Sequence, residues 1–317
     1  MLHLRLIVPA DATDEVVRLL ETTVGTAHLA VLTGAARDPA GDVVLCDVAR
    51  EAGDELIGAL RDMGIDQSGS ITVENMDLTL SAHADRAEKA APGEGADAVL
   101  WAELTEATHE ESTFSVTYVA FLAVATMLAA CGVMLDNAIL IVGAMAVGPE
   151  FGPLAGISTA LVRRSPHLVW RALWTLIAGF AIAMVVTAGF AWLMDAFGLF
   201  TRSMVEGDRP NTAFIWKPDW MSFVVAFLAG IAGTLSLTSA KSGALIGVAI
   251  SVTTVPAAAN AAVAFSYSDY TQTIGSTQQL LANLGGIVLA GTLTLLVQKG
   301  LWAVHRRSEA AVKRPPV

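Results

Sequence analysis

The residues best suited to chemistry lie in an apolar stretch. There Glu150 stands among the helix-breaking residues Gly148, Pro149, Gly152 and Pro153. Proline has no N–H and clashes with the carbonyl four residues before it, so each proline frees a backbone oxygen from helical pairing. A carboxylate at membrane depth is unfavourable unless it is paired, hydrated or protonated. The combination predicts a binding site for a small solute, a cation or a proton.

A second break with polar neighbours lies about a hundred residues further on, at Pro256. At ~1.5 Å per residue, Pro149 lies roughly 18 Å and Pro256 about 21 Å along its predicted helix, so both breaks are expected near one plane close to mid-bilayer. We therefore expect this break to complete the site with the side chains of Thr253, Thr254 and Asn260.

Glu150 also has a structural interpretation, in which it lies at a kink near the cytoplasmic end of its helix and faces water or an arginine such as Arg163. The functional interpretation is favoured, because an intramembrane ionisable residue within a Gly/Pro break is typical of transport sites. Asp136 and Asn137 are secondary candidates, for which a helix cap is favoured over a direct role in the site. Lys241 is a third, and a lysine that snorkels to the membrane surface is its structural explanation.

The sequence predicts no metal site and no cofactor. Its six histidines are scattered without ligand spacing, and its two cysteines, Cys46 and Cys131, lie in different halves of the chain. No nucleophile and base occur at matching spacing, so an intramembrane enzyme is the weakest functional hypothesis.

The charges divide the chain into two parts. Residues 1–111 hold 22 of the 30 acids and 7 of the 19 Lys and Arg residues, leaving 8 acids and 12 bases in the remainder. An acidic N-terminal part lacks the clustered basic residues that bind phosphate backbones, so we expect no nucleic-acid partner. Its apolar start is too short for a signal peptide, and we expect this part to lie in the cytoplasm.

The C-terminal part predicts an all-α membrane domain. Its charge-free runs, each of at least 21 residues, are long enough to cross ~30 Å of hydrocarbon as helices. Splitting these runs at their turn signals predicts six transmembrane helices, at about 113–132, 137–162, 169–195, 220–239, 242–264 and 277–303.

Basic residues orient these helices. The segment Arg163–Arg171 and the C-terminal residues Arg306 and Arg307 are positive, and positive segments mark the cytoplasmic side. Six crossings place both segments with the N-terminal part. The expected localisation is therefore the bacterial inner membrane, with both termini cytoplasmic.

Similar stretches recur at an offset of 106 to 107 residues. Val119–Ala123 repeats as Val225–Ala229, and Pro149 matches Pro256. Three helices per unit would insert the second unit from the opposite side, which predicts a 3+3 inverted-topology repeat, an arrangement typical of secondary transporters.

The N-terminal part alternates apolar and polar residues in four strand-like runs and has helical periodicity in two others. The predicted order is β-α-β-β-α-β, an α+β ferredoxin-like domain. It could serve packing and assembly or, in the sharper interpretation, sense a small molecule. The predicted domains are a cytoplasmic ferredoxin-like domain at 1–80, a linker at 81–111, three-helix repeats at 112–205 and 206–305, and a basic tail at 306–317.

Two motifs in order, Tyr118–Gly156 and Gly230–Pro256, are similar to a known membrane family. The chain resembles the prokaryotic "uncharacterised hydrophobic domain" proteins, the domain of unknown function three-eight-nine, over roughly residues 112–265. Glu150 and Phe151 depart from the leucine–methionine pair of the family pattern, so the resemblance implies no role for Glu150. It implies a six-helix bacterial membrane protein and no particular activity.

These observations favour a secondary transporter or an ion- or proton-coupled solute pathway with a cytoplasmic regulatory or assembly domain. The alternative is a membrane-embedded sensor or scaffold that carries no flux. The expected partners are membrane lipid, a small solute or ion, and further copies of the chain in a homo-oligomer.

Overall fold

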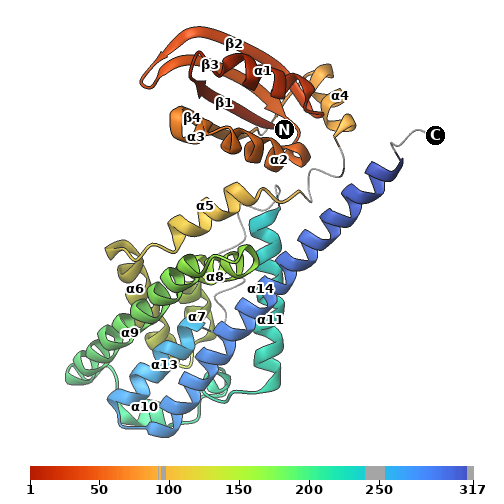
Figure 1. The fold of residues 1–317 in the computed structure, drawn as a ribbon. Helices are drawn as coiled ribbons and strands as arrows, with labels where there is room; N and C mark the ends of the chain where they lie inside the picture. The colour runs from red at the N-terminus through yellow and green to blue at the C-terminus, as the bar shows by residue number, and fades with distance from the viewer. Residues whose placement is uncertain (77, 92, 94–97, 240–253, 313–317) are drawn as a thin grey trace. The chain divides into compact units, whose positions relative to one another are not determined.

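The computed structural model describes residues 1–317 except 77, 92, 94–97, 240–253 and 313–317. The chain divides into two compact units. The first consists mainly of Met1–Leu104, and the second consists mainly of Thr105–Leu237 together with a later segment that ends at Gln298. We call the first unit the head and the second the membrane half. Figure 1 shows their elements.

The head contains an antiparallel four-stranded sheet with the strand order β2-β3-β1-β4. All four predicted strands and both predicted helices are found. An extra helix, α4, follows in the segment predicted as a linker. The elements are β1 (Leu2–Val8), α1 (Thr13–Thr22), β2 (Thr26–Arg37), β3 (Ala40–Val48), α2 (Arg50–Asp62), α3 (Ile65–Ser68), β4 (Ser70–Asn75) and α4 (Ala82–Ala90).

Alternation along β1 builds the core of the head. Leu2, Leu4 and Leu6 are fully buried, whereas Arg5 between them is exposed, because successive strand residues point to opposite faces. Leu20 of α1 and Leu56 of α2 belong to the same hydrophobic cluster. The apolar side chains of the strand and of the two helices therefore form one hydrophobic core.

The membrane half is helical, as predicted. Its elements, beginning within the helix α5 (Trp101–Glu111), are α6 (Val116–Met134), α7 (Ala138–Met145), α8 (Phe151–Arg163), α9 (Pro166–Ala196), α10 (Arg202–Glu206), η1 (Ala213–Ile215), α11 (Trp220–Thr238), α13 (Thr254–Ser266) and α14 (Tyr270–Val312).

The prediction of six membrane-spanning helices is wrong for the described residues. Four helices are long and apolar enough to cross a membrane, at Val116–Met134, Pro166–Ala196, Trp220–Thr238 and Tyr270–Trp302. They support a membrane-embedded protein.

The predicted second span, 137–162, is instead two short helices, α7 and α8, separated by residues 146–150. At ~1.5 Å per residue, α7 is about 12 Å and α8 about 20 Å long, so neither crosses ~30 Å of hydrocarbon alone. Pro149 lies in the break. Pro153 lies in the first turn of α8, where a helix tolerates proline because N–H groups there have no intrahelical acceptor. The predicted helix 137–162 is therefore interrupted at Pro149, as the sequence indicates.

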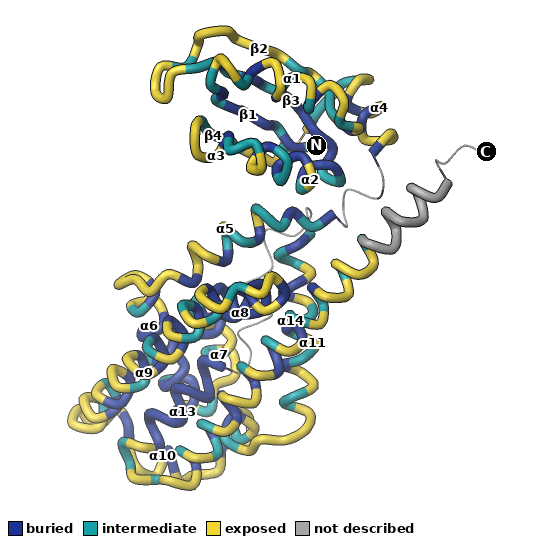
Figure 2. Tube along the Cα trace, viewed as in Figure 1, coloured by how far each residue is buried: buried dark blue, intermediate teal, exposed yellow. Residues whose placement is uncertain are grey.

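The predicted fifth span, 242–264, lies outside the described residues up to position 253. Its described part, α13, has 13 residues and packs against α6, α7 and α9. Every residue of Thr254–Ala264 is buried, and Figure 2 shows α13 buried along its length. A helix enclosed on all sides can carry polar side chains only where neighbouring elements satisfy them.

Candidate functional site

Glu150 lies at the N-cap position of α8, directly after the break. Its side chain is 2% exposed, and its Oε1 accepts a hydrogen bond of 2.6 Å from the Thr254 hydroxyl. Thr254 is the first residue of α13, so a contact across 104 residues joins the two predicted breaks. The break thus brings a carboxylate and a hydroxyl together inside the membrane half.

The glycines of the break make room for carboxylates. A Cβ added to Gly148 would collide with the Glu150 carboxylate and would lie 2.9 Å from Val255 Cγ2. A Cβ added to Gly152 would lie 2.5 Å from the Cβ of Glu111 and 2.7 Å from its Oε2. All three distances are shorter than the contacts that a Cβ atom normally makes. The two glycines therefore admit one acidic side chain each.

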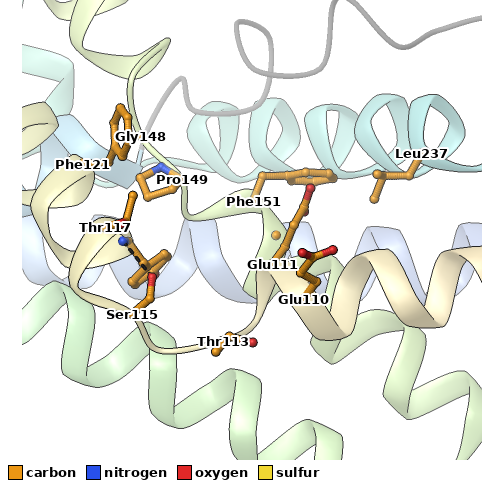
Figure 3. Close-up of a pocket in the computed structure, with 12 residues that line it drawn as sticks. Glu110, Glu111, Thr113, Ser115, Thr117, Phe121, Gly148, Pro149, Phe151 and Leu237 are labelled. Atoms are coloured by element: carbon orange, nitrogen blue, oxygen red, sulfur yellow. Dashed lines mark hydrogen bonds between the residues drawn. The ribbon is translucent and has the colours of Figure 1, made fainter.

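A cavity of about 520 Å³ lies beside the break. Figure 3 shows it between the segment that leads into α6 and the break residues. Its wall combines acidic, hydroxyl and aromatic side chains with the break backbone: Glu110, Glu111, Thr113, Ser115, Thr117, Tyr118, Phe121, Gly148, Pro149, Phe151, Gly152 and Leu237.

The cavity carries negative charge. Burial of the Glu111 carboxyl against α8 and, second, repulsion from Glu110 raise the pKa of Glu111. Arg171 donates to Thr113 on the cavity wall at 2.6 Å, and its other terminal nitrogen contacts the ring of His109 at 2.5 Å. Arg171 thus contacts a residue of the cavity wall without being among the described lining residues itself.

Tyr118 connects the cavity with the break. It lines the cavity while being only 6% exposed, and its hydroxyl has no hydrogen-bond partner among the described residues. The Glu150 charge interacts with this hydroxyl electrostatically. A buried hydroxyl without a partner is unfavourable, which indicates a place for a polar ligand or water.

Asn260, the other polar residue predicted for the site, contacts a different group. Its Oδ1 accepts from Arg209 Nη1 at 3.2 Å, and its Nδ2 donates to the Ser276 hydroxyl at 2.7 Å. Arg209 is 5% exposed, although it lies in the segment that connects α10 with η1, and it also donates to Gln272 Oε1. Asn260 is therefore part of a buried polar network around an arginine that the sequence did not identify.

Arg209 forms no salt bridge with any residue that the structure describes. Burial lowers its pKa, and the charges of Asp136 and Asp269 oppose this effect. Its guanidinium is satisfied by neutral amide oxygens, which makes it a tie between a loop and two helices.

Asp136 and Asn137 have structural contacts. Asn137 caps α7 by accepting a hydrogen bond of 3.1 Å from the Leu140 N–H. Asp136 accepts from the Thr212 hydroxyl at 2.8 Å and from Asn211 Nδ2 at 2.9 Å. Partial burial of Asp136 acts to raise its pKa, but these hydrogen bonds outweigh burial and lower the pKa below its usual value. Both residues therefore organise the start of α7, and Asp136 joins it to the segment between α10 and η1.

The other residues that the sequence predicts for the site are the three prolines, Thr253 and Lys241. Pro149 lines the cavity, while Pro153 and Pro256 are buried in the first turns of α8 and α13. Thr253 and Lys241 lie outside the described residues. Arg163, the expected alternative neighbour of Glu150, donates to the Thr105 hydroxyl at 2.8 Å.

A buried polar stripe on α14 was missed by the sequence analysis. Gln272, Ser276, Gln279 and Asn283 are all buried, and their spacing of four, three and four residues places them on one helix face. This spacing was visible in the sequence, and it would have identified the face of α14 that packs inward.

Within the described part of the chain, no group of three or more His, Cys, Asp or Glu side chains could hold a metal ion. Both cysteines are free. The groups that the described site residues bring together are carboxyl groups, hydroxyls and aromatic rings.

The comparisons with known proteins agree with the resemblance found in the sequence. Residues 145–289, a stretch within the membrane half, match the family described as "Domain of unknown function (DUF389)". An uncharacterized protein of Methanocaldococcus jannaschii is 27% identical over 135 residues, which are 43% of this chain and 39% of that protein. The chain thus matches well under half of that relative's length. No solved structure matches the chain.

Proposed function

We propose that this member of the DUF389 family is a secondary transporter, an ion- or proton-coupled solute pathway of the bacterial inner membrane. The observation that carries the proposal is the buried Glu150 carboxylate at the break between α7 and α8, bonded to Thr254 at the start of α13. Interrupted helices with polar groups at their ends are the usual place for solute and ion binding in secondary transporters.

The chemistry of this pair suits ion coupling. A carboxylate enclosed in a low-dielectric interior is stabilised by taking up a proton or by holding a cation, so its occupancy can be linked to the conformation around it. The neighbouring cavity of about 520 Å³ supplies access for a solute. Glu150 is assigned as the coupling residue and Thr254 as its positioning partner.

Three further features belong to the proposal. The matching prolines Pro149 and Pro256 support an inverted repeat. The basic segments Arg163–Arg171 and Arg306–Arg307 support a cytoplasmic position for both termini. The exposed apolar faces of the four spans suit lipid and further copies of the chain in a homo-oligomer.

The head is proposed to be a ferredoxin-like regulatory or assembly module, which its strand order β2-β3-β1-β4 supports. A cavity of about 370 Å³ in the head is lined by residues that include Glu21, His83 and Arg86. This polar cavity favours the alternative function, a membrane-embedded sensor that binds a ligand in the head and carries no flux.

Uptake by proteoliposomes separates the two functions. The full-length protein, reconstituted in vesicles with an inward proton gradient, is expected to accumulate solutes from a panel of radiolabelled amines, amino acids, sugars and carboxylates. Glu150→Gln is isosteric and cannot ionise, so it is expected to abolish the dependence on the gradient. Glu206→Gln, an exposed carboxylate of the same membrane half, is the matched control.

Full gradient-driven uptake by Glu150→Gln would remove Glu150 from the mechanism. A folded protein that moves no solute, together with a ligand that stabilises the head, would replace transport by sensing.

A further inference from the structure

The cavity beside the break has features that define a class of ligand. Its volume of about 520 Å³ is far larger than one ion and lies in the range of small-molecule sites. Its wall includes the aromatic rings of Tyr118, Phe121 and Phe151. A wall of this size and composition suits an organic molecule with an apolar body.

The charged groups on the wall are all acidic. Glu110 and Glu111 line the cavity, and no lysine, arginine or histidine is among its described lining residues. Arg171 donates to Thr113 on the wall and contacts His109, and among the described residues it forms no salt bridge with Glu110 or Glu111. Two adjacent carboxylates repel each other, and a positive ligand between them relieves this repulsion.

The Tyr118 hydroxyl is an independent observation. It is nine-tenths buried on the cavity wall and has no partner in the part of the chain that the structure describes. A hydroxyl both donates and accepts, so a polar group of a ligand can satisfy it. The ring itself can face a cation, since aromatic rings attract ammonium groups through their negative faces.

We propose that this cavity binds a small organic ammonium ion, with Glu110 and Glu111 facing the charge, the aromatic rings facing the apolar body, and the Tyr118 hydroxyl bonded to a polar group of the ligand. As a binding site the cavity stands independently of transport. As the access route of the solute to Glu150 it rests on the proposed function.

The test uses choline as the probe, because choline has a close uncharged analogue, 3,3-dimethyl-1-butanol, in which carbon replaces the nitrogen. Thermal unfolding of the purified full-length protein in detergent is followed with choline chloride, with the uncharged analogue and with sodium chloride at equal ionic strength. A ligand of the folded state raises the Tm in a saturable way. We expect choline alone to do so.

Two variants locate the effect. Glu111→Gln and Tyr118→Phe are each expected to weaken choline binding roughly tenfold, the loss of one favourable contact to a partly desolvated cation. Tyr118→Phe removes a hydroxyl without a described partner, so its Tm without ligand is expected to stay unchanged, which separates lost binding from lost folding. Glu206→Gln, outside the cavity, should bind as the parent does.

Equal stabilisation by the uncharged analogue would overturn the proposal, because the site would then recognise shape without charge. A folded protein that no choline concentration stabilises would overturn it as well, as would unchanged affinity in both cavity variants.

Binding of choline and uptake of solutes are measured separately, so the ammonium site and the transport function can fail independently. Choline binding without choline uptake by proteoliposomes would contradict transport and leave the ammonium site standing. Gradient-driven uptake of other solutes by a protein that does not bind choline would contradict the ammonium site and leave transport standing.

Discussion

Glu150 and Arg209 are both ionisable side chains buried in the membrane half, with exposed fractions of 2% and 5%, but their surroundings differ. Glu150 lies at a helix break beside a cavity, and a hydroxyl from α13 donates to it. Arg209 lies in a connecting segment and donates to the amide oxygens of Asn260 and Gln272 on α13 and α14. The first environment is the one that the proposed function uses for taking up and releasing a proton or ligand. In the second, the charge ties a loop to two helices.

The difference teaches that burial of a charge alone does not identify a functional site. A guanidinium has five donors in a rigid fork, so it can satisfy several fixed oxygens at once and serve as a structural tie. A carboxylate only accepts and changes charge by taking up a proton. We therefore expect removal of Arg209 to act mainly on stability, and removal of the Glu150 charge to act mainly on coupling.

Arg209→Ala is the sharpest test of this contrast and has the largest expected effect on stability. It leaves two buried amide oxygens without their donor, at ~1–3 kcal/mol each, so we expect a loss of about 3 kcal/mol in the free energy of unfolding. The Tm in detergent should fall by roughly 5–10 °C. Arg202→Ala, an exposed arginine of α10 that pairs with Glu206, is the control and should leave the Tm unchanged. If the two variants behave alike, Arg209 is no structural tie.

Gly148→Ala tests the close packing at the break and should have the next largest effect. Its Cβ would collide with the Glu150 carboxylate and crowd Val255, so we expect a loss of about 2 kcal/mol, typical of overpacking. Gly143→Ala in α7 is the matched control, since its Cβ would meet no atom within 4 Å. The control should gain up to ~1 kcal/mol from helix propensity. A stabilising effect of Gly148→Ala would contradict the placement of Glu150.

Asp136→Asn should have the smallest effect, visible only in acid. A carboxyl with a lowered pKa contributes stability that is present above its unfolded pKa of about 3.9 and is lost as the pH falls through its folded pKa. The parent Tm should therefore decline below about pH 4 more steeply than that of the variant. The raised pKa of Glu111 has the opposite sign, because its contribution is lost as the pH rises.

Tm measurements in steps across this acid range check the prediction. Asp208→Asn, at an exposed residue of the segment that connects α10 with η1, should follow the parent at every pH. A variant Asp136→Asn that declines as steeply as the parent would exclude the hydrogen bonds of Asp136 as the cause.

Much of the head could be predicted because its signals are local. Alternation in Leu2–Val8 and the helical periodicity of Arg50–Asp62 reflect which side chains face the core, and Gly64 adopts the positive φ of 75° that ends the second helix. The break at Pro149 was predictable for the same reason, since proline acts on its own backbone. The number of spans was not, because apolar composition does not distinguish a spanning helix from a short helix enclosed by others.

The candidate site was predicted only in part. Glu150 and Thr254 meet as expected, because each lies within two residues of a proline that the sequence marks as a break, Pro149 and Pro256. Asn260 was assigned to the same site, but its contacts are with Arg209 and Ser276. Residues six apart on a helix such as Thr254 and Asn260 point in different directions, so shared proximity to a break does not imply a shared site.

The division between an acidic head and a weakly basic membrane half, the four strands and the position of the helix break follow from the sequence alone, since charge, periodicity and proline geometry act within one segment. The tertiary structure alone decided which distant groups meet. It placed Glu111 against Gly152 and left the hydroxyl of the cavity-lining Tyr118 buried without a partner among the described residues. It also buried the side chain of Arg209, a loop residue, against Asn260 of α13. These contacts depend on how whole helices pack, because the residues involved lie far apart in the chain and no local pattern links them.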